Sequence, residues 1–452
     1  MLVLGLGVTG EAVVRHRSAA GDDVTVVEDA PTGNDVYRER VKAARAVGAA
    51  IVERPSLDQL TELVGRADVL VPSPGAPLRH PAIATAHRAG IAVRAEVDMG
   101  AEVAAGRGKE LVAVTGTNGK TTVTTLIVAM LDAAGVAALG AGNIGFALLD
   151  AADAEADVLV VEVSSFQLAC TTEAFRPGVA VLLNVAPDHL DWHGSFGEYA
   201  AAKSRVFANQ RERDLLVFNG DDEVASRLAE VAPARRVAFT LESDANAFRI
   251  EEGALVDPTG AVIADTAQMP FSAPHDRANA LAAAAAALAA GATRDAVGRA
   301  LREYPRLHHR VARIGNAGGV HYYDDSKATN PHATVAAVSA FGEREGRVVL
   351  LAGGRNKGLD LSVLRALAPR LRAVVAIGEA ADDVEAAFAG AIPVARAKSM
   401  RDAVSTAAQR AQPGDVVLLS PACASFDWYP SYSARGDDFA REVARLSERG
   451  VA

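Results

Sequence analysis

The chain has 452 residues, half of them hydrophobic, and a formal net charge of −10. This length exceeds what one ordinary core supports and predicts two to four domains. The acidic balance argues against a nucleic-acid-binding surface, which needs a net-basic face. Cys170 and Cys423 are the only cysteines and lie far apart, a usage typical of a reducing cytosol and not of a disulfide framework or a zinc site.

The sequence shows no targeting or membrane-spanning signal, which agrees with the cysteine usage. The chain begins directly with an apolar strand and a glycine turn, so we expect no signal peptide. The most apolar stretch, at 281–291, is too short and too alanine-rich to span a bilayer and is predicted to be a helix buried in protein. We therefore expect a cytoplasmic protein.

Short apolar runs alternate with longer amphipathic segments along the whole chain. This pattern is typical of parallel sheets covered by helices on both faces and predicts an α/β protein. We divide the chain into three domains, 1–105, 106–303 and 304–452, and interpret the glycine-rich, charged stretch 104–110 as a linker.

The first block opens with a strand predicted at 2–5, a glycine turn, a helix and a strand at 23–28. The turn, GLGVTG from Gly5 to Gly10, is followed by Glu28 and Asp29 at the end of the second strand. This is a dinucleotide fingerprint, in which the acid contacts a ribose hydroxyl. The pattern alone favours NAD, although such a turn also holds the diphosphate of other nucleotides.

The second block carries the strongest local signal. The segment TGTNGKTT, Thr115 to Thr122, stands between a strand predicted at 111–116 and a helix. Backbone N–H groups of such a loop bind phosphate, Lys120 adds positive charge, and a threonine hydroxyl can reach Mg²⁺. The loop is shorter than the usual phosphate-loop motif because position 114 is valine, so an ordinary glycine turn is the alternative.

Charged side chains follow the later strands of this block, predicted at 157–163, 179–185 and 215–218. Glu162 ends the first of them, where its charge needs a partner, and Mg²⁺ fits that role. Lys203 lies on a helix predicted at 198–207, and a lone lysine on a helix is usually solvated. The loop after the second strand holds four residues that are, taken singly, more readily solvated than metal-bound: Asp188, His189, Asp191 and His193.

The third block holds strands predicted at 320–323, 347–352, 373–377 and 415–420. Three of them end in polar segments, DDSKATNP, GGRNKG and SPACASFD. Because the carboxyl ends of parallel strands meet at one sheet edge, we expect these segments to converge. Lysines with hydroxyl and backbone donors suit a carboxylate or phosphate ligand there, and ordinary turns are the alternative.

Taken together, TGTNGKTT, VEVSSFQL, NVAPDHLDWH, HHR at 308–310, DDSKATNP and SPACASFD resemble the Mur ligase family over essentially the whole chain, and most closely its D-glutamate-adding branch. The resemblance implies a Rossmann-like N-terminal domain for a UDP-substrate, a central P-loop-type ATPase domain, and a Rossmann-like C-terminal domain that closes to deliver the amino acid. The implied reaction activates the carboxylate of UDP-N-acetylmuramoyl-L-alanine as an acyl phosphate, which D-glutamate attacks, in peptidoglycan precursor synthesis. These small molecules are the expected partners of a monomer, with neither nucleic acid nor membrane.

The resemblance also implies residue roles. ATP would contact Gly116, Thr117, Asn118, Gly119, Lys120, Thr121, Thr122, Asn279, Arg310, Asp325 and Lys327. The UDP-substrate would contact Gly7, Val8, Thr9, Asn143 and His189, and D-glutamate would contact Thr329, Lys357, Ser425 and Tyr432. Mg²⁺ would be held by Thr121, Glu162, His189 and Lys203, the last as a carbamate formed with CO₂. Lys120, Glu162, His189 and Lys203 would be the catalytic set.

Two other classes of function stay open. An NAD-dependent dehydrogenase would use the first glycine motif but leaves the second one and Glu162 unexplained. An ATP-binding regulator or scaffold would bind nucleotide without releasing ADP.

Overall fold

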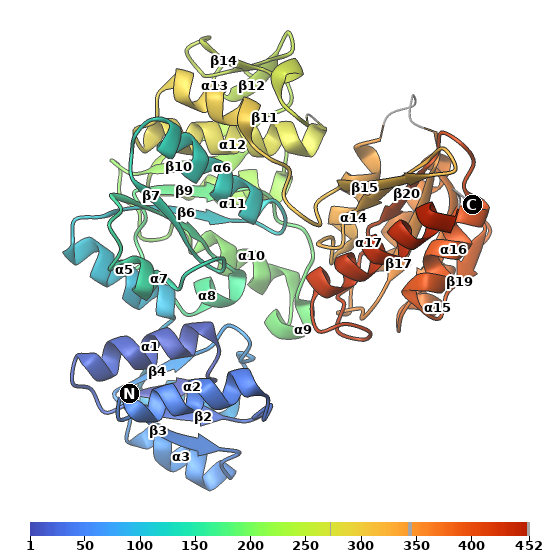
Figure 1. Cartoon of the computed structure of the whole chain (residues 1–452). Helices are drawn as coiled ribbons and strands as arrows, with labels where there is room; N and C mark the ends of the chain where they lie inside the picture. The colour runs from blue at the N-terminus through green and yellow to red at the C-terminus, as the bar shows by residue number, and fades with distance from the viewer. Residues whose placement is uncertain (272, 342–345, 450–452) are drawn as a thin grey trace. The chain divides into compact units, whose positions relative to one another are not determined.

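The computed structural model describes residues 1–271, 273–341 and 346–449. Its strands form three sheets of five, nine and six strands (Figure 1). The chain divides into two compact units. The first holds the five- and nine-stranded sheets, and the second holds the six-stranded sheet. The first unit comprises Met1–Val185, Trp192–Met269 and Arg277–Tyr304, and the second comprises Ala186–Asp191, Pro270–Asp276 and Pro305–Ala452.

The N-terminal sheet is parallel throughout and has the strand order β3-β2-β1-β4-β5. Val3, Val26 and Val71 are fully buried beneath the helices, which explains the apolar runs in the sequence. Both predicted strands of this block and the glycine turn between them are confirmed. Its elements are β1 Leu2–Leu4, α1 Val8–Ala19, β2 Thr25–Glu28, α2 Asp35–Ala46, β3 Ala50–Glu53, α3 Leu57–Gly65, β4 Val69–Pro72, α4 Pro81–Ala89 and β5 Ala92–Val93.

The predicted linker at 104–110 is wrong. Helix α5 (Glu96–Gly106) runs through its first half, and strand β6 (Glu110–Thr115) begins at its last residue. Alanine is the strongest helix former, and Ala104 is fully buried, so this segment continues the helix. Only three residues connect the two elements, and Gly108 among them has a φ of +71°.

The central sheet has the order β14-β13-β12-β11-β10-β9-β6-β8-β7 and is parallel from β12 to β7, with β13 and β14 added antiparallel. The predicted strand at 179–185 ends early, at Leu182, and the predicted helix at 198–207 ends at Ser204. The strands after β6 are β7 Ala138–Gly142, β8 Val158–Glu162, β9 Val179–Leu182, β10 Leu215–Asn219, β11 Arg235–Thr240, β12 Phe248–Glu251, β13 Ala254–Val256 and β14 Val262–Asp265.

The helices around this sheet include the predicted alanine-rich one. Helix α12 (Pro274–Ala289) is buried from Ala280 to Ala287, as expected. No helix in the described part of the chain is both long and apolar enough to cross a membrane. The remaining helices are α6 Lys120–Ala133, α7 Leu148–Ala151, α8 Ser165–Ala169, α9 Leu190–His193, α10 Phe196–Ser204, α11 Glu223–Ala229, η1 Thr266–Gln268 and α13 Arg294–Glu303.

The third sheet has the order β15-β16-β20-β17-β18-β19, with only β15 antiparallel to its neighbour. Strands β16, β20 and β17 are adjacent, so the three polar strand ends converge as predicted. Its elements are β15 Ala312–Ala317, β16 Val320–Asp324, α14 Pro331–Ser339, β17 Val348–Gly353, η2 Leu361–Arg370, β18 Leu371–Ile377, α15 Ala381–Phe388, β19 Val394–Arg396, α16 Met400–Arg410, β20 Val416–Leu419 and α17 Tyr432–Arg449.

Candidate active site

The loop between β6 and α6 is held in shape from the end of β9. The backbone N–H of Thr117 donates to the carbonyl oxygen of Asn184 at 2.8 Å. The side chain of Asn184 pairs reciprocally with the Asn118 backbone, because its Oδ1 accepts from the N–H (2.8 Å) and its Nδ2 donates to the carbonyl oxygen (3.1 Å). Sequence reasoning missed Asn184, and its only signal was a polar residue just past a buried strand.

Gly119 immediately precedes α6 and has a φ of +87°, a left-handed conformation that favours glycine. A Cβ at this position would lie 2.5 Å from Oδ1 of Asn279, so the structure brings Asn279 against the loop. Nζ of Lys120 donates to the carbonyl oxygens of Gly116 (2.9 Å) and Thr117 (3.0 Å). A helix N-terminus and an ammonium group therefore lie together, which is the arrangement that binds phosphate.

Glu162 ends β8 with a carboxylate that is buried, with 2% exposure. Its Oε1 accepts a hydrogen bond from Nδ2 of Asn143 at 2.8 Å, whereas its buried Oε2 has no hydrogen-bond partner among the described residues. A buried carboxylate oxygen without a partner is costly, and a hard cation removes that cost. The residue therefore fits a Mg²⁺ ligand. Within the described residues, His, Cys, Asp and Glu side chains form no metal-binding group of three or more.

Lys203 is not solvated, contrary to expectation for a lone lysine on a helix. It is 1% exposed, and its Nζ donates to the carbonyl oxygen of Gly116 at 2.7 Å. The same Nζ lies 4.6 Å from the centroid of the Tyr199 ring, and the Tyr199 hydroxyl is 3.0 Å from Oγ1 of Thr117. Tertiary packing thus places Lys203 beside the phosphate loop, which a single helix sequence does not reveal.

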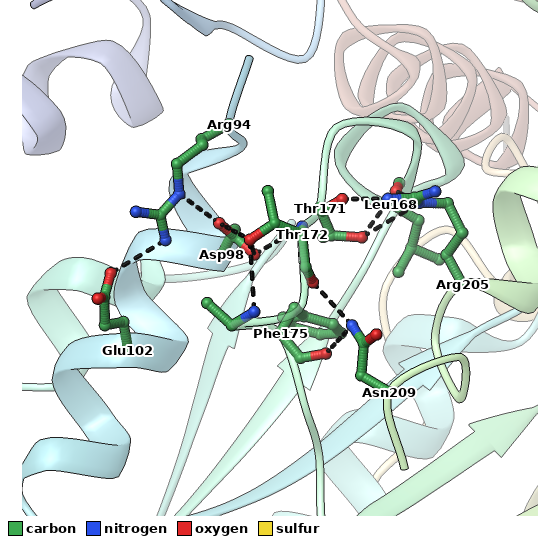
Figure 2. A network of polar contacts seen from close by, with 10 residues as sticks. Arg94, Asp98, Glu102, Leu168, Thr171, Thr172, Phe175, Arg205 and Asn209 are labelled. Atoms are coloured by element: carbon green, nitrogen blue, oxygen red, sulfur yellow. Dashed lines mark hydrogen bonds and ion pairs between the residues drawn. The ribbon is translucent and has the colours of Figure 1, made fainter. Parts of the chain in front are cut away.

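The helix that carries Lys203 is fixed to its surroundings by the polar network in Figure 2. Arg205, which follows the helix, donates through Nε to the carbonyl oxygen of Leu168 (2.8 Å) and through its terminal nitrogen to that of Thr171. Asp98, fully buried on α5, accepts from the N–H (2.8 Å) and hydroxyl (2.9 Å) of Thr172. Further contacts run from Asn209 to Thr172 and Phe175, and from Arg94 to Asp98 and Glu102.

His193 also departs from the solvated interpretation, since it is 4% exposed and its Nε2 lies 2.9 Å from Oγ of Ser165. Its ring stacks on Phe166 and contacts Trp192 and Tyr199 edge-on. This aromatic group links the start of α8 to α10. Asp191, by contrast, is exposed.

Glu28, the acid expected to contact a ribose, instead forms a hydrogen bond with the N-terminal glycine turn. Oε2 of Glu28 accepts from the backbone N–H of Leu6 at 3.0 Å. Gly10 can bear no side chain, because a Cβ would lie 2.1 Å from the carbonyl oxygen of Gly5, and that oxygen also accepts from the Ser73 hydroxyl (3.0 Å). Of the residues expected to contact the UDP-substrate, Gly7 precedes α1, and Val8 and Thr9 form its start.

In the second unit, Asp188 is buried and ion-paired, so its solvated interpretation is also wrong. Its Oδ1 lies 2.5 Å from Nζ of Lys357, and its Oδ2 accepts from Nδ2 of Asn330 at 3.1 Å. Burial alone would raise the pKa of Asp188, but the charges of Lys357 and His189 outweigh it and hold that pKa below its ordinary value. His189 has a φ of +53° and a half-buried side chain.

The other expected residues of the second unit follow the converging strands. Asp325 is buried, and its Oδ2 accepts from the Ser420 hydroxyl at 2.8 Å. Burial raises its pKa to about 7, against the opposing effects of Ser420 and Arg310. Nζ of Lys327 lies 3.9 Å from the Tyr432 ring centroid. Thr329 is half-buried, and Ser425 is 2% exposed.

Arg435 is a further buried group that sequence reasoning missed. It is 1% exposed and donates to Ser326 and to the carbonyl oxygen of Cys423, so it ties two of the polar strand ends together. Burial lowers its pKa to about 10. No sequence pattern marked it, because it lies on the amphipathic helix α17.

Three protein-family models match this chain, one in the region of each sheet. Residues 1–95 match the "Mur ligase MurD-like, N-terminal domain", residues 114–287 the "Mur ligase middle domain", and residues 309–423 the "Mur ligase, glutamate ligase domain". The chain belongs to the Mur ligase family. Family membership confirms the resemblance drawn from the motifs and excludes the NAD-dependent dehydrogenase.

Curated relatives of this Mur ligase are similar over nearly their full length. A protein of Frankia casuarinae is 42% identical, with 98% of this chain and 93% of the relative covered. One of Desulfosudis oleivorans is 40% identical, with 99% and 96% covered. Both are named UDP-N-acetylmuramoylalanine--D-glutamate ligase.

Solved structures confirm the Mur ligase fold. The MurF ligase of Thermotoga maritima in complex with ADP has a TM-score of 0.64 at 17% identity, with 95% of this chain and 96% of that chain covered. The UDP-N-acetylmuramate-alanine ligase of the same organism has a TM-score of 0.57 at 19% identity, with 99% and 98% covered. The predicted three-domain α/β architecture is therefore confirmed.

Proposed function

We propose that this Mur ligase joins D-glutamate to UDP-N-acetylmuramoyl-L-alanine and converts ATP to ADP and phosphate, in the synthesis of peptidoglycan precursors. The names and full-length coverage of the relatives support the substrates. One structural observation carries the chemistry. The lysine-bearing phosphate loop lies in the same unit as the buried Glu162 carboxylate, one oxygen of which has no hydrogen-bond partner in the part of the chain that the structure describes.

The phosphate loop and Lys120 bind the ATP phosphates, through backbone N–H groups at the start of α6 and the charge of the ammonium. Asn279 lies against Gly119 and lines the same loop. Glu162 and Lys203, the latter as a carbamate, would hold Mg²⁺ together with Thr121 and His189. Such an ion would supply positive charge against the transferring phosphoryl group.

Amide formation from a free carboxylate is uphill in water, so the carboxylate of the first substrate attacks the γ-phosphorus of ATP. The bond from this phosphorus to the β-phosphate oxygen breaks, ADP leaves, and the carboxylate becomes an acyl phosphate. Lys120 stabilises the negative charge that develops on the transferring group. The amine of D-glutamate then attacks the acyl carbon, the bond from that carbon to the phosphate oxygen breaks, and phosphate and the amine proton leave. Correct placement of this amine is the main requirement of the second step.

Residues of the second unit select the amino acid. Lys357 and Thr329 take one carboxylate of D-glutamate, and Ser425 with the backbone near Tyr432 takes the other. Asn143, His189 and the turn that includes Gly7 bind the UDP-substrate, and Arg310, Asp325 and Lys327 contribute to ATP binding. We further propose that the domains span 1–105, 106–303 and 304–452 and that the enzyme acts as a cytoplasmic monomer.

An ADP-release assay tests this function. Purified enzyme with Mg-ATP and UDP-N-acetylmuramoyl-L-alanine is given D-glutamate, L-glutamate, L-alanine or a diamino acid in separate reactions. We expect ADP release with D-glutamate at least 10²-fold faster than with the others, since a site built on carboxylate contacts rejects ligands that leave buried polar groups unpaired. Equal rates with L-glutamate would contradict the assigned substrate, and nucleotide binding without ADP release would indicate a regulator.

A further inference from the structure

Glu96 is a buried carboxylate that the reaction does not use. It is the first residue of α5, is 1% exposed, and its Oε1 accepts from the backbone N–H of Leu149 at 2.7 Å. Its Oε2 is buried and has no hydrogen-bond partner among the described residues. A glutamate in this position needs an explanation, because burial of a carboxylate is costly.

Leu149 is the second residue of α7 (Leu148–Ala151), and this helix lacks a cap of its own. The residue before it, Ala147, has no side chain that can accept from the first N–H groups. The N–H groups at a helix start need acceptors, and a remote carboxylate supplies one here. Glu96 therefore caps α7 from a different element.

Close packing keeps α5 and α7 in this arrangement. A Cβ on Gly100 would lie 2.7–2.8 Å from atoms of Leu148, so the two helices approach as closely as they do only because position 100 is glycine. In the first turn of α5, Asp98 fixes the helix to Thr172 and pairs with Arg94 (Figure 2). The first turn of α5 is thus a rigid support for α7.

The start of α7 bounds the loop that carries Asn143. This loop is closed by a hydrogen bond from the N–H of Gly142 to the carbonyl oxygen of Phe146 at 2.8 Å. Within it, the backbone N–H and Nδ2 of Asn143 donate to the carbonyl oxygen and Oε1 of Glu162, each at 2.8 Å. Both ends of the loop are therefore held, one by Glu162 and the other through α7 by Glu96.

We propose that Glu96 is a positioning residue for Asn143, and thereby for the UDP-substrate that Asn143 contacts in the proposed function. Glu96 acts through Leu149 and α7 and touches no substrate itself. Glu96 acts on the loop from Gly142 to Ala147, so we expect it to govern binding of the UDP-substrate and not of D-glutamate, whose proposed contacts lie in the second unit.

The test compares Glu96→Leu and Glu96→Gln with a matched control, Glu155→Leu, at an exposed position between α7 and β8. Glutamine keeps an oxygen that accepts from Leu149, whereas leucine does not. For Glu96→Leu we expect KM for the UDP-substrate to rise about 10-fold, with KM for D-glutamate changed less than about 2-fold, because a displaced binding loop lowers affinity. Glu96→Gln and Glu155→Leu are expected to keep the wild-type KM.

A wild-type KM in Glu96→Leu, or equal increases in KM for both substrates, would overturn the proposal. If Glu96→Leu does not fold, Ala147→Asp decides the outcome in a Glu96→Ala background, because a local N-cap replaces the remote one and should restore the KM for the UDP-substrate. No restoration would overturn the proposal. Hydrogen exchange of residues 142–151 gives a readout independent of turnover: faster exchange in Glu96→Leu than in wild type is expected even if the proposed ligase reaction is not observed, whereas unchanged exchange would overturn the positioning role.

Discussion

Asn143 donates through Nδ2 to Oε1 of the buried Glu162 carboxylate at 2.8 Å, and this bond leaves Oε2 as the oxygen available to a cation. Glu162→Gln keeps an acceptor for Asn143 and removes the charge. We expect the Mg²⁺ concentration for half-maximal activity to rise at least 10-fold, because an amide is a poorer ligand for a hard cation. A Mg²⁺ titration of ADP release measures this, and an unchanged half-saturation would contradict the ligand role.

Lys120 supplies the positive charge of the phosphate loop. For Lys120→Ala we expect kcat to fall by about 10³-fold, because electrostatic stabilisation of the transferring phosphoryl group is lost. The measurement is ADP release under saturating substrates. Asp132→Ala, at an exposed position in the last turn of α6, is the control. Near-wild-type turnover in Lys120→Ala would show that ATP binds elsewhere.

Lys203 lies buried beside the phosphate loop, where a carbamate would supply an anionic ligand. Lys203→Ala should lose activity by about 10²-fold or more and regain part of it with added formate or acetate, because a small carboxylate can occupy the space and the ligand position. Rates are measured with and without the added anion, and chloride is the control. Loss of activity without recovery would argue against a carbamate.

Lys357 forms an ion pair with the buried Asp188, and loss of the lysine leaves an uncompensated buried charge. We expect Lys357→Met to lower the free energy of unfolding by about 3 kcal/mol at pH 7 and Lys357→Met/Asp188→Asn to recover most of it. The pKa of Asp188 is lowered in the folded protein, so the pair stabilises above the ordinary carboxylate pKa and is lost as the pH falls. Denaturant unfolding at pH 7 and pH 3 checks both statements.

The buried Glu96 carboxylate should make stability depend on pH with the opposite sign to the Asp188–Lys357 pair. Burial raises its pKa to about 7 from an ordinary value of 4.5, so the unfolded chain releases this proton at lower pH than the folded one. The free energy of unfolding should therefore fall by about 3 kcal/mol in total as the pH rises from about 4.5 to 7. Glu96→Gln should abolish this decrease and be more stable than wild type at pH 8. The measurement is the free energy of unfolding of both proteins across this pH range. The same decrease in wild type and Glu96→Gln would contradict the prediction.

The local signals in the sequence predicted much of the architecture. The strand, loop and helix around Thr115 to Thr122 were correct because all three depend on neighbouring residues: an apolar run, glycines with special φ, and a helix start. The three polar strand ends were expected to meet because parallel strands align their carboxyl ends. The prediction for 104–110 was wrong because its glycines and charges suggested a linker, whereas the buried alanine continues α5.

The sequence by itself determined the fold class, the phosphate loop and the family, since these rest on patterns within short segments and on their order. Only the tertiary structure decided that Lys203 contacts Gly116, that Asp188 pairs with Lys357, and that Glu96 caps α7. Each of these relationships joins residues far apart in the chain, and whether a charged side chain is solvated or buried depends on what packs against it. The sequence of one helix or loop does not identify the distant residues that pack against it.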